Sequence, residues 1–172
     1  MKILVAGVGN IFLRDDGFGV AVARHLDGAD LPEQATVADF GIRGIHLAYE
    51  LTGGGYDLTI LVDATTRGGP PGTLYVLEPD TGTPGPAPGA SHAAALPDAH
   101  ALTPETVLAL AGTFGDGTAA KVLIVGCEPA DISPGMDLTA TVAQAVPKAA
   151  DMVTELIHQH LAETGPVHQE NP

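Results

Sequence analysis

Acidic residues follow two apolar segments of the sequence, at points where buried strands are expected to end. Asp15 and Asp16 come shortly after the apolar run 3–8, and Asp63 directly follows the run 58–62. Helix capping would account for one aspartate of the pair, and an Asp after a strand often only orders a loop. Capping does not account for both aspartates. Carboxylates gathered in one crevice could act as acid–base groups or bind a cation.

Apolar, β-prone runs alternate with segments of helical spacing along most of the chain. Phe18, Val22 and Leu26, for example, are four residues apart, as on one face of a helix. Such alternation predicts a parallel sheet covered on both faces, with right-handed crossovers. Strands are expected at 3–6, 35–40, 58–62, 74–77 and 121–125, and helices at 17–27, 45–51, 103–111 and 139–161.

The predicted fold is α/β. We expect a single doubly wound domain, 1–162, whose five-stranded and mainly parallel sheet has the strand order 2-1-3-4-5 and carries helices on both faces. A polar tail at 163–172 is expected to be disordered, and the Pro/Gly-rich stretch 79–90 is not expected to pack. Pro147 should either kink the last helix or mark a late start of it.

This topology predicts where the acidic residues lie. The first and third strands are neighbours in such a sheet, and ligands bind where the strand order reverses. Asp16 and Asp63 should therefore meet at the carboxyl ends of these two strands. A nearby imidazole would favour a borderline metal, and His92 and His100, both in the long connection before the fifth strand, are the candidates.

Two other chemistries are weakly supported. Gly7 and Gly9 follow the first strand as in a dinucleotide-binding turn, but the third glycine of that fingerprint would be residue 12, which is Phe12. Cys127, the only cysteine, follows an apolar run and has no matched His partner, so it is interpreted as a packing residue and not as a nucleophile.

Composition limits the partners. Seven Lys and Arg against 21 Asp and Glu give a formal net charge of -14, which repels nucleic acid and anionic membrane surfaces. No apolar stretch approaches the roughly 20 residues of a membrane helix. A single cysteine cannot form an intrachain disulfide, which favours a reducing compartment. We expect a soluble, cytoplasmic protein with no nucleic-acid or membrane partner.

Several motifs together resemble the hydrogenase maturation proteases, in order over residues 1 to about 155. They are GVGN with DDGFG, VDA at 62–64, DAHALTPETVL at 98–108 and VGCEP at 125–129, while DFGIRGIHLAYEL at 39–51 resembles one branch of the family. The sequence departs from the family pattern at the 79–90 stretch and at Thr139, where relatives often carry Ser. Neither departure touches the acidic residues described above.

The resemblance implies a site and a role for it. An acid in the first loop, an Asp after the third strand and a His before the fourth helix bind a metal together in this family, and these positions fall on Asp16, Asp63 and His100. His100 fits better than His92 because its distance to the 107–108 helix matches the family pattern. Two carboxylates and one imidazole leave coordination positions open. The triad is therefore expected to engage nickel carried by the substrate, and no permanently bound ion is implied.

The function implied is that of an endopeptidase that removes the C-terminal extension of a nickel-iron hydrogenase large-subunit precursor after nickel insertion. The precursor is the expected partner, and the enzyme is expected to be a monomer. The alternatives are a non-enzymatic nickel-binding or chaperone module, which usually has a His-rich or Cys-rich tract that is absent here, and a nucleotide-binding domain.

The remaining polar residues have simpler interpretations. Asp39, Gly41 and Arg43 are candidates for a substrate-facing loop, and Asn10 for ordering the first turn, although turn building would explain the glycine and the asparagine equally well. Three further histidines have no metal-like spacing and are expected to be exposed: His158, His160 and His168.

Overall fold

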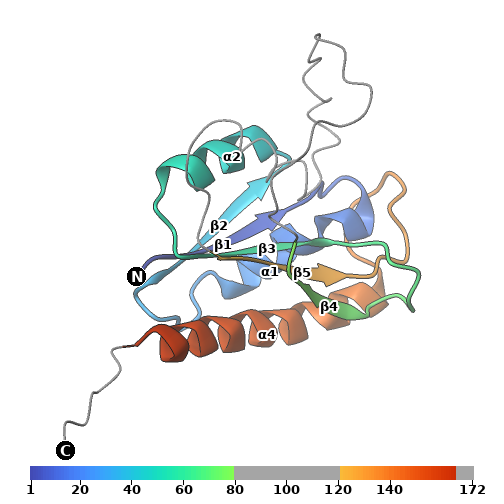
Figure 1. Cartoon of the computed structure of the whole chain (residues 1–172). Helices are drawn as coiled ribbons and strands as arrows, with labels where there is room; N and C mark the ends of the chain where they lie inside the picture. Colours follow the sequence, from blue (N-terminus) through green and yellow to red (C-terminus); the bar gives the residue numbers. More distant parts are fainter. Residues whose placement is uncertain (80–120, 166–172) are drawn as a thin grey trace, which may run out of the picture.

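Apolar runs form the centre of one five-stranded sheet in the computed structural model, which describes residues 1–79 and 121–165. Both central strands, β1 and β3, are buried along their apolar runs, as expected for strands covered on both faces. The predicted α/β class with a mainly parallel sheet is confirmed (Figure 1). The strands are β1 (Ile3–Val8), β2 (Ala35–Gly41), β3 (Leu58–Ala64), β4 (Leu74–Leu77) and β5 (Lys121–Cys127).

The predicted strand order 2-1-3-4-5 is wrong at one edge, because the observed order is β2-β1-β3-β5-β4. β5 pairs in parallel with β3, and β4 pairs antiparallel with β5. The reason is the short connection 65–73 between β3 and β4. A parallel neighbour of β3 would need a crossover of about a dozen residues or more. β4 instead pairs antiparallel with β5 and forms the edge strand of the sheet. The predicted neighbourhood of β1 and β3 is correct.

Helices cover both faces of the sheet (Figure 1). α1 and α4 pack on one face, where their apolar side chains join Ile3 and Val5 of β1 in one core cluster. α2 packs on the other face with Leu4 and Ala6. None of the described helices is long and apolar enough to cross a membrane. The helical elements are η1 (Arg14–Gly17), α1 (Phe18–Leu26), α2 (Gly44–Gly53) and α4 (Ala140–Thr164).

The last helix differs from its prediction at the carboxyl end. α4 runs to Thr164, three residues beyond the predicted end at 161, so its last turn enters the segment expected to be a disordered tail. Pro147 lies inside this helix and does not mark its start. The predicted helix at 103–111, the 79–90 stretch from residue 80 onwards and the tail from 166 lie outside the described residues.

Close contact between α1 and the sheet positions the ends of β1 and β3. A Cβ atom on Gly19 would lie 2.0 Å from the carbonyl oxygen of Val62 and 2.4 Å from that of Val8. A Cβ on Gly7 would similarly lie 2.3 Å from the carbonyl oxygen of Gly19. Only glycine, which has no Cβ, allows this approach. Gly7 is therefore explained by the packing of α1 on β1, and a dinucleotide-binding role is not needed to account for it.

Candidate functional site

Asp16, in η1, and Asp63, in β3, both lie close to Gly9, the residue that follows β1. Gly9 has φ +133°, and a Cβ atom built on it would lie 1.9 Å from the carbonyl oxygen of Asp16 and 3.6 Å from Oδ1 of Asp63. A side chain at position 9 would therefore be strained and would collide with the backbone of Asp16. The structure thus places both predicted acidic residues near Gly9, close to the carboxyl ends of β1 and β3.

Backbone N–H groups orient both carboxylates. Oδ2 of Asp16 accepts a hydrogen bond of 2.9 Å from the N–H of Asn10, and Oδ1 of Asn10 accepts one of 2.9 Å from the N–H of Phe12. Oδ1 of Asp63 accepts a 2.8 Å hydrogen bond from the N–H of Ala64. Both aspartates are half-buried. Asn10 orders the first turn, as the sequence suggested, and its backbone also holds Asp16.

The third predicted ligand, His100, lies outside the described residues, and so does His92. Within residues 1–79 and 121–165, no group of three or more His, Cys, Asp or Glu side chains is arranged to hold a metal ion. The pair of Asp16 and Asp63 alone offers hard oxygen ligands, which fit one side of a coordination shell. The metal-binding triad remains a prediction.

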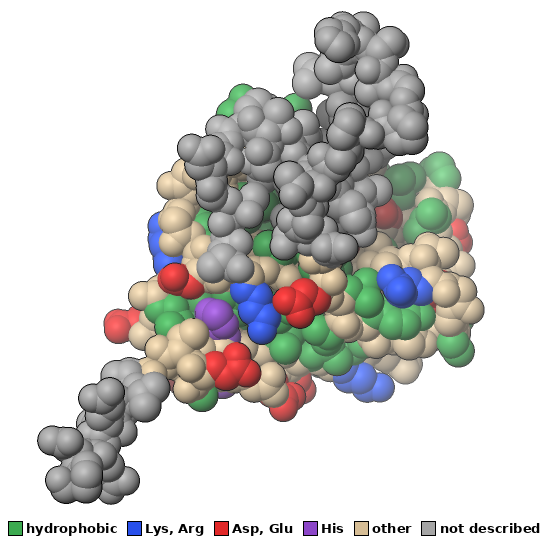
Figure 2. Space-filling view, in the orientation of Figure 1, with side chains coloured by type: hydrophobic (Ala, Val, Ile, Leu, Met, Phe, Trp, Pro, Cys, Tyr) green, Lys and Arg blue, Asp and Glu red, His purple; other side chains and the backbone are tan. Residues whose placement is uncertain are grey.

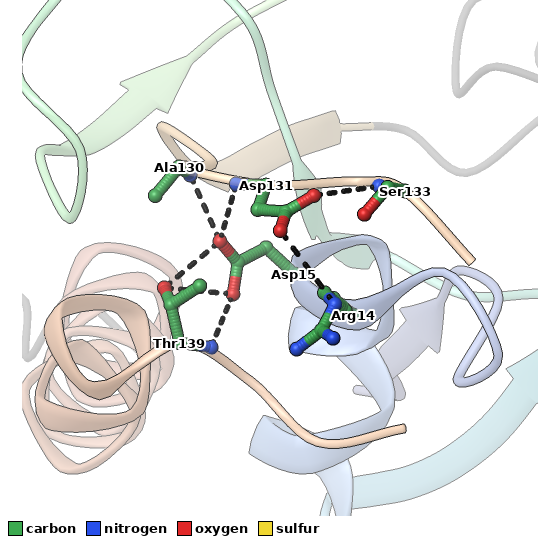
Figure 3. A network of polar contacts seen from close by, with 6 residues as sticks. All are labelled: Arg14, Asp15, Ala130, Asp131, Ser133 and Thr139. Carbon is green, nitrogen blue, oxygen red and sulfur yellow. Dashed lines mark hydrogen bonds and ion pairs between the residues drawn. The ribbon is translucent and has the colours of Figure 1, made fainter. Parts of the chain in front are cut away.

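Asp15 has a different environment from its neighbour. Its side chain is fully buried, and its carboxylate accepts hydrogen bonds from the N–H groups of Ala130 (2.8 Å), Asp131 (2.9 Å) and Thr139 (2.8 Å). The hydroxyl of Thr139 approaches both carboxylate oxygens, at 3.0 and 2.9 Å (Figure 3). The loop between β5 and α4 and the start of α4 are thus tied to the first loop. We call these contacts the Asp15 clamp.

The interpretation of one aspartate of the pair as a helix cap is wrong. Neither η1 nor α1 has a side-chain hydrogen bond at its N-cap. Asp15 lies instead at the amino end of α4, where a carboxylate also interacts favourably with the helix dipole. Sequence analysis missed this role because Ala130 and Thr139 are 115 and 124 residues away along the chain. The only local indication of another role for Asp15 was that helix capping could account for just one of the two adjacent aspartates.

Glu128, the acid of the VGCEP motif, anchors the loop that follows Asp63. This buried side chain accepts hydrogen bonds from the N–H of Arg67 (2.8 Å), the N–H of Gly68 (3.2 Å) and the hydroxyl of Tyr75 (3.0 Å). The hydrogen bond from Arg67, above all, lowers the pKa of Glu128 below its ordinary value. Sequence analysis gave Glu128 no role, again because its partners are distant in the chain.

Cys127 is poorly suited to nucleophilic chemistry. The side chain is fully buried, and burial raises the pKa of its thiol to about 11, helped by the negative charges of Asp15 and Glu128. The thiol is therefore protonated at neutral pH, whereas the thiolate is the reactive form. This agrees with the interpretation of Cys127 as a packing residue.

The candidate residues of the substrate-facing loop gather in one groove beside the site. An open groove of about 270 Å³ lies between residues 9–12 and 39–43, with apolar lining from Phe12, Phe40 and Ile42. Arg43 donates hydrogen bonds to the carbonyl oxygens of Asp39 and Phe40. Gly41, with φ +51°, forms the turn. Gly9 also lines this groove, so the groove adjoins the region of Asp16 and Asp63.

The histidines of α4 are not part of this region. His158 is exposed, as predicted. His160 is half-buried, contrary to the prediction, and lines a small cavity with Leu58 and Lys121, the first residues of β3 and β5. The cavity is thus at the opposite ends of the strands from Asp16 and Asp63. His168 lies outside the described residues.

We expect Asp15→Ala to destabilise the fold by about 3 kcal/mol, because three N–H groups and the Thr139 hydroxyl lose the fully buried carboxylate that accepts their hydrogen bonds. Asp30→Ala removes an exposed acid and is the matched control, expected within about 0.5 kcal/mol of the parent. Urea denaturation followed by circular dichroism measures both values. Equal stability of the two variants would show that the clamp contributes nothing to folding.

Comparison with known proteins identifies the family of this chain. The family model described as hydrogenase maturation protease matches residues 20–156. The hydrogenase expression/formation protein HupD of Rhizobium leguminosarum bv. viciae is 31% identical over 158 residues, which cover 91% of this chain and 74% of HupD. The hydrogenase 2 maturation protease of Escherichia coli is 29% identical over 168 residues, covering 96% of each chain.

Solved structures agree with the sequence comparison. The hydrogenase maturating endopeptidase HybD from E. coli superimposes with a TM-score of 0.69 at 27% identity, covering 96% of this chain and 94% of HybD. The hydrogenase 2 maturation peptidase from Thaumarchaeota archaeon SCGC_AB-539-E09 gives a TM-score of 0.66 at 28% identity, covering 91% and 98% of the two chains. The chain therefore belongs to the hydrogenase maturation protease family, a family of endopeptidases.

Proposed function

We propose that this peptidase removes the C-terminal extension of a nickel-iron hydrogenase large-subunit precursor and uses nickel already inserted in that precursor as its recognition element. Family membership supports a role in hydrogenase maturation. The observation that supports the more specific proposal is that Asp16 and Asp63 both lie close to Gly9, at the carboxyl ends of the central strands, where open α/β folds bind ligands. The proposal places the enzyme in the cytoplasm, as a monomer.

In this proposal Asp16, Asp63 and His100 engage the nickel ion while the precursor holds it. Backbone N–H groups orient the two aspartates, so little reorganisation is needed when the metal arrives. Three protein ligands leave coordination positions for groups of the precursor. Nickel then acts as a checkpoint, because a precursor without it lacks the ion that brings its extension to the site.

Nickel dependence tests this function directly. Metal-free enzyme is incubated with the precursor of its own hydrogenase in nickel-loaded, nickel-free and zinc-loaded forms, and mass spectrometry follows loss of the extension. We expect cleavage of the nickel-loaded form only. Efficient cleavage of the nickel-free form would end the checkpoint proposal, and binding of the nickel-loaded form with no cleavage would favour a nickel-binding chaperone.

Two single substitutions separate the metal-site proposal from a thiol mechanism. Asp16→Ala should abolish cleavage because it removes a nickel ligand, whereas Cys127→Ala should leave most activity because the buried thiol is protonated and only packs. Cleavage of the nickel-loaded precursor is measured for both variants, with circular dichroism to verify folding. A folded Cys127→Ala enzyme with only background activity would contradict the assignment.

A further inference from the structure

Apolar side chains from two loops line the groove that adjoins Gly9. Phe12 is 62% exposed and Ile42 is 48% exposed, and they come from the two segments between which the groove lies. Phe40, which packs against the core cluster on the α2 face, and the buried Val20 also line it. We call this space the Phe12–Ile42 groove. Figure 2 shows hydrophobic side chains at the right of the view, the end toward which β1, β3 and β5 run in Figure 1.

Hydrogen bonds fix the two segments that form the groove. The N–H of Gly9 donates a 2.9 Å hydrogen bond to the carbonyl oxygen of Gly41, which joins the segments to each other. The N–H of Phe12 donates to Oδ1 of Asn10, and the carbonyl oxygen of Phe12 accepts a 2.8 Å hydrogen bond from the N–H of Gly135. A surface ordered before binding loses little conformational entropy on association. Apolar groups held exposed in this way are typical of a binding groove.

The charged residues that line the groove have partners within the protein. Nε of Arg24 lies 3.8 Å from Oδ2 of Asp39. The guanidinium of Arg43 donates hydrogen bonds to the carbonyl oxygens of Asp39 and Phe40. The other lining residues are uncharged, and most of them are apolar. The groove therefore requires no charged group in its occupant, and an apolar side chain suits it best.

Two features favour a polypeptide substrate as the occupant. The chain belongs to a family of endopeptidases, so its active site receives part of another polypeptide, with residues on both sides of the cleaved bond. The groove adjoins the candidate site directly, because Gly9 lines it and lies close to Asp16 and Asp63. Its volume of about 270 Å³ is below the roughly 300–1,000 Å³ of pockets that bury drug-sized molecules, so it suits one or two side chains of such a segment.

We propose that the Phe12–Ile42 groove is a specificity subsite that receives an apolar side chain of the hydrogenase precursor, from a residue close to the bond that is cut. This inference rests on the proposed function, because it takes the precursor as the substrate. Binding of this side chain removes apolar surface of both molecules from water. Phe12, Phe40 and Ile42 are thus residues that determine specificity, and they take no part in the chemical step.

A double-mutant cycle between enzyme and precursor tests the subsite. Mass spectrometry locates the cut, the apolar residues near it are replaced one at a time by Ser in the nickel-loaded precursor, and kcat/KM is measured. With the wild-type enzyme, at least one replacement should lower kcat/KM about tenfold or more, because the subsite loses its apolar side chain. With the Phe12→Ser/Ile42→Ser enzyme, the same replacement should have little further effect, because substitutions on the two sides of one contact are not additive.

Val76→Ser is the matched control for the enzyme. Val76 is 44% exposed on the edge strand β4 and does not line the groove, so this variant should keep the wild-type kcat/KM and the full sensitivity to the precursor replacement. Circular dichroism checks folding. If the double variant does not fold, Phe12→Ala, a single change at an exposed side chain, should show the same pattern in weaker form. Additive effects at every precursor position in the folded variants would overturn the proposal.

The outcomes also separate this inference from the proposed function. If the wild type cleaves the nickel-loaded precursor and the cycle is additive, the proposed function stands and the subsite is overturned. If the wild type cleaves no form of the precursor, the proposed function fails, and the same cycle is measured on the affinity for nickel-free precursor by biolayer interferometry. Coupling in that cycle supports the subsite, and additivity overturns it. A wild-type dimer that the double variant converts to a monomer would show that a second copy occupies the groove, which would also overturn the proposal.

Discussion

The hydrogen bonding of the buried Asp15 carboxylate is the interaction on which the candidate site depends most. Burying a charge is costly unless its hydrogen-bonding capacity is used, and this one accepts from three N–H groups and a hydroxyl. The contacts join the first loop to the segment before α4, more than 100 residues away. Asp16, the next residue, is positioned by the same loop. The two aspartates therefore have different roles: Asp15 holds the backbone, and Asp16 is half-buried close to Gly9.

A second buried acid has a similar role beside β3. Glu128 accepts hydrogen bonds from N–H groups of the loop that follows β3, the strand that carries Asp63 near its end. Asp15 and Glu128 therefore order the two loops that leave β1 and β3, while Gly19 allows α1 to pack against both strand ends. Burial, together with the negative charges of Asp15 and Glu128, raises the pKa of the Cys127 thiol, so Cys127 is a protonated packing residue and not an activated thiol.

The sequence allowed the local features to be predicted and left the long-range ones open. Apolar runs followed by Asp indicated the ends of β1 and β3, and the neighbourhood of these strands followed from general topology. The predicted order is wrong at the β4 edge because it puts the strand 74–77 next to the third strand, although the connection before 74–77 is too short for a parallel crossover. The roles of Asp15 and Glu128 could not be predicted from spacing, since their partners are distant in the chain. His100 was assigned only by family resemblance and lies outside the described residues.

The measurement that tests the central claim most directly is a titration of metal-free protein with Ni²⁺, followed by assigned backbone amide NMR signals. Paramagnetic nickel broadens the signals of residues near it. The account predicts that signals of Asp16, Asp63 and His100 broaden together, at the same nickel concentration, and that Asp63→Asn weakens the effect at all three positions. Broadening confined to the histidines of α4, with the signals of Asp16 and Asp63 unchanged, would contradict it.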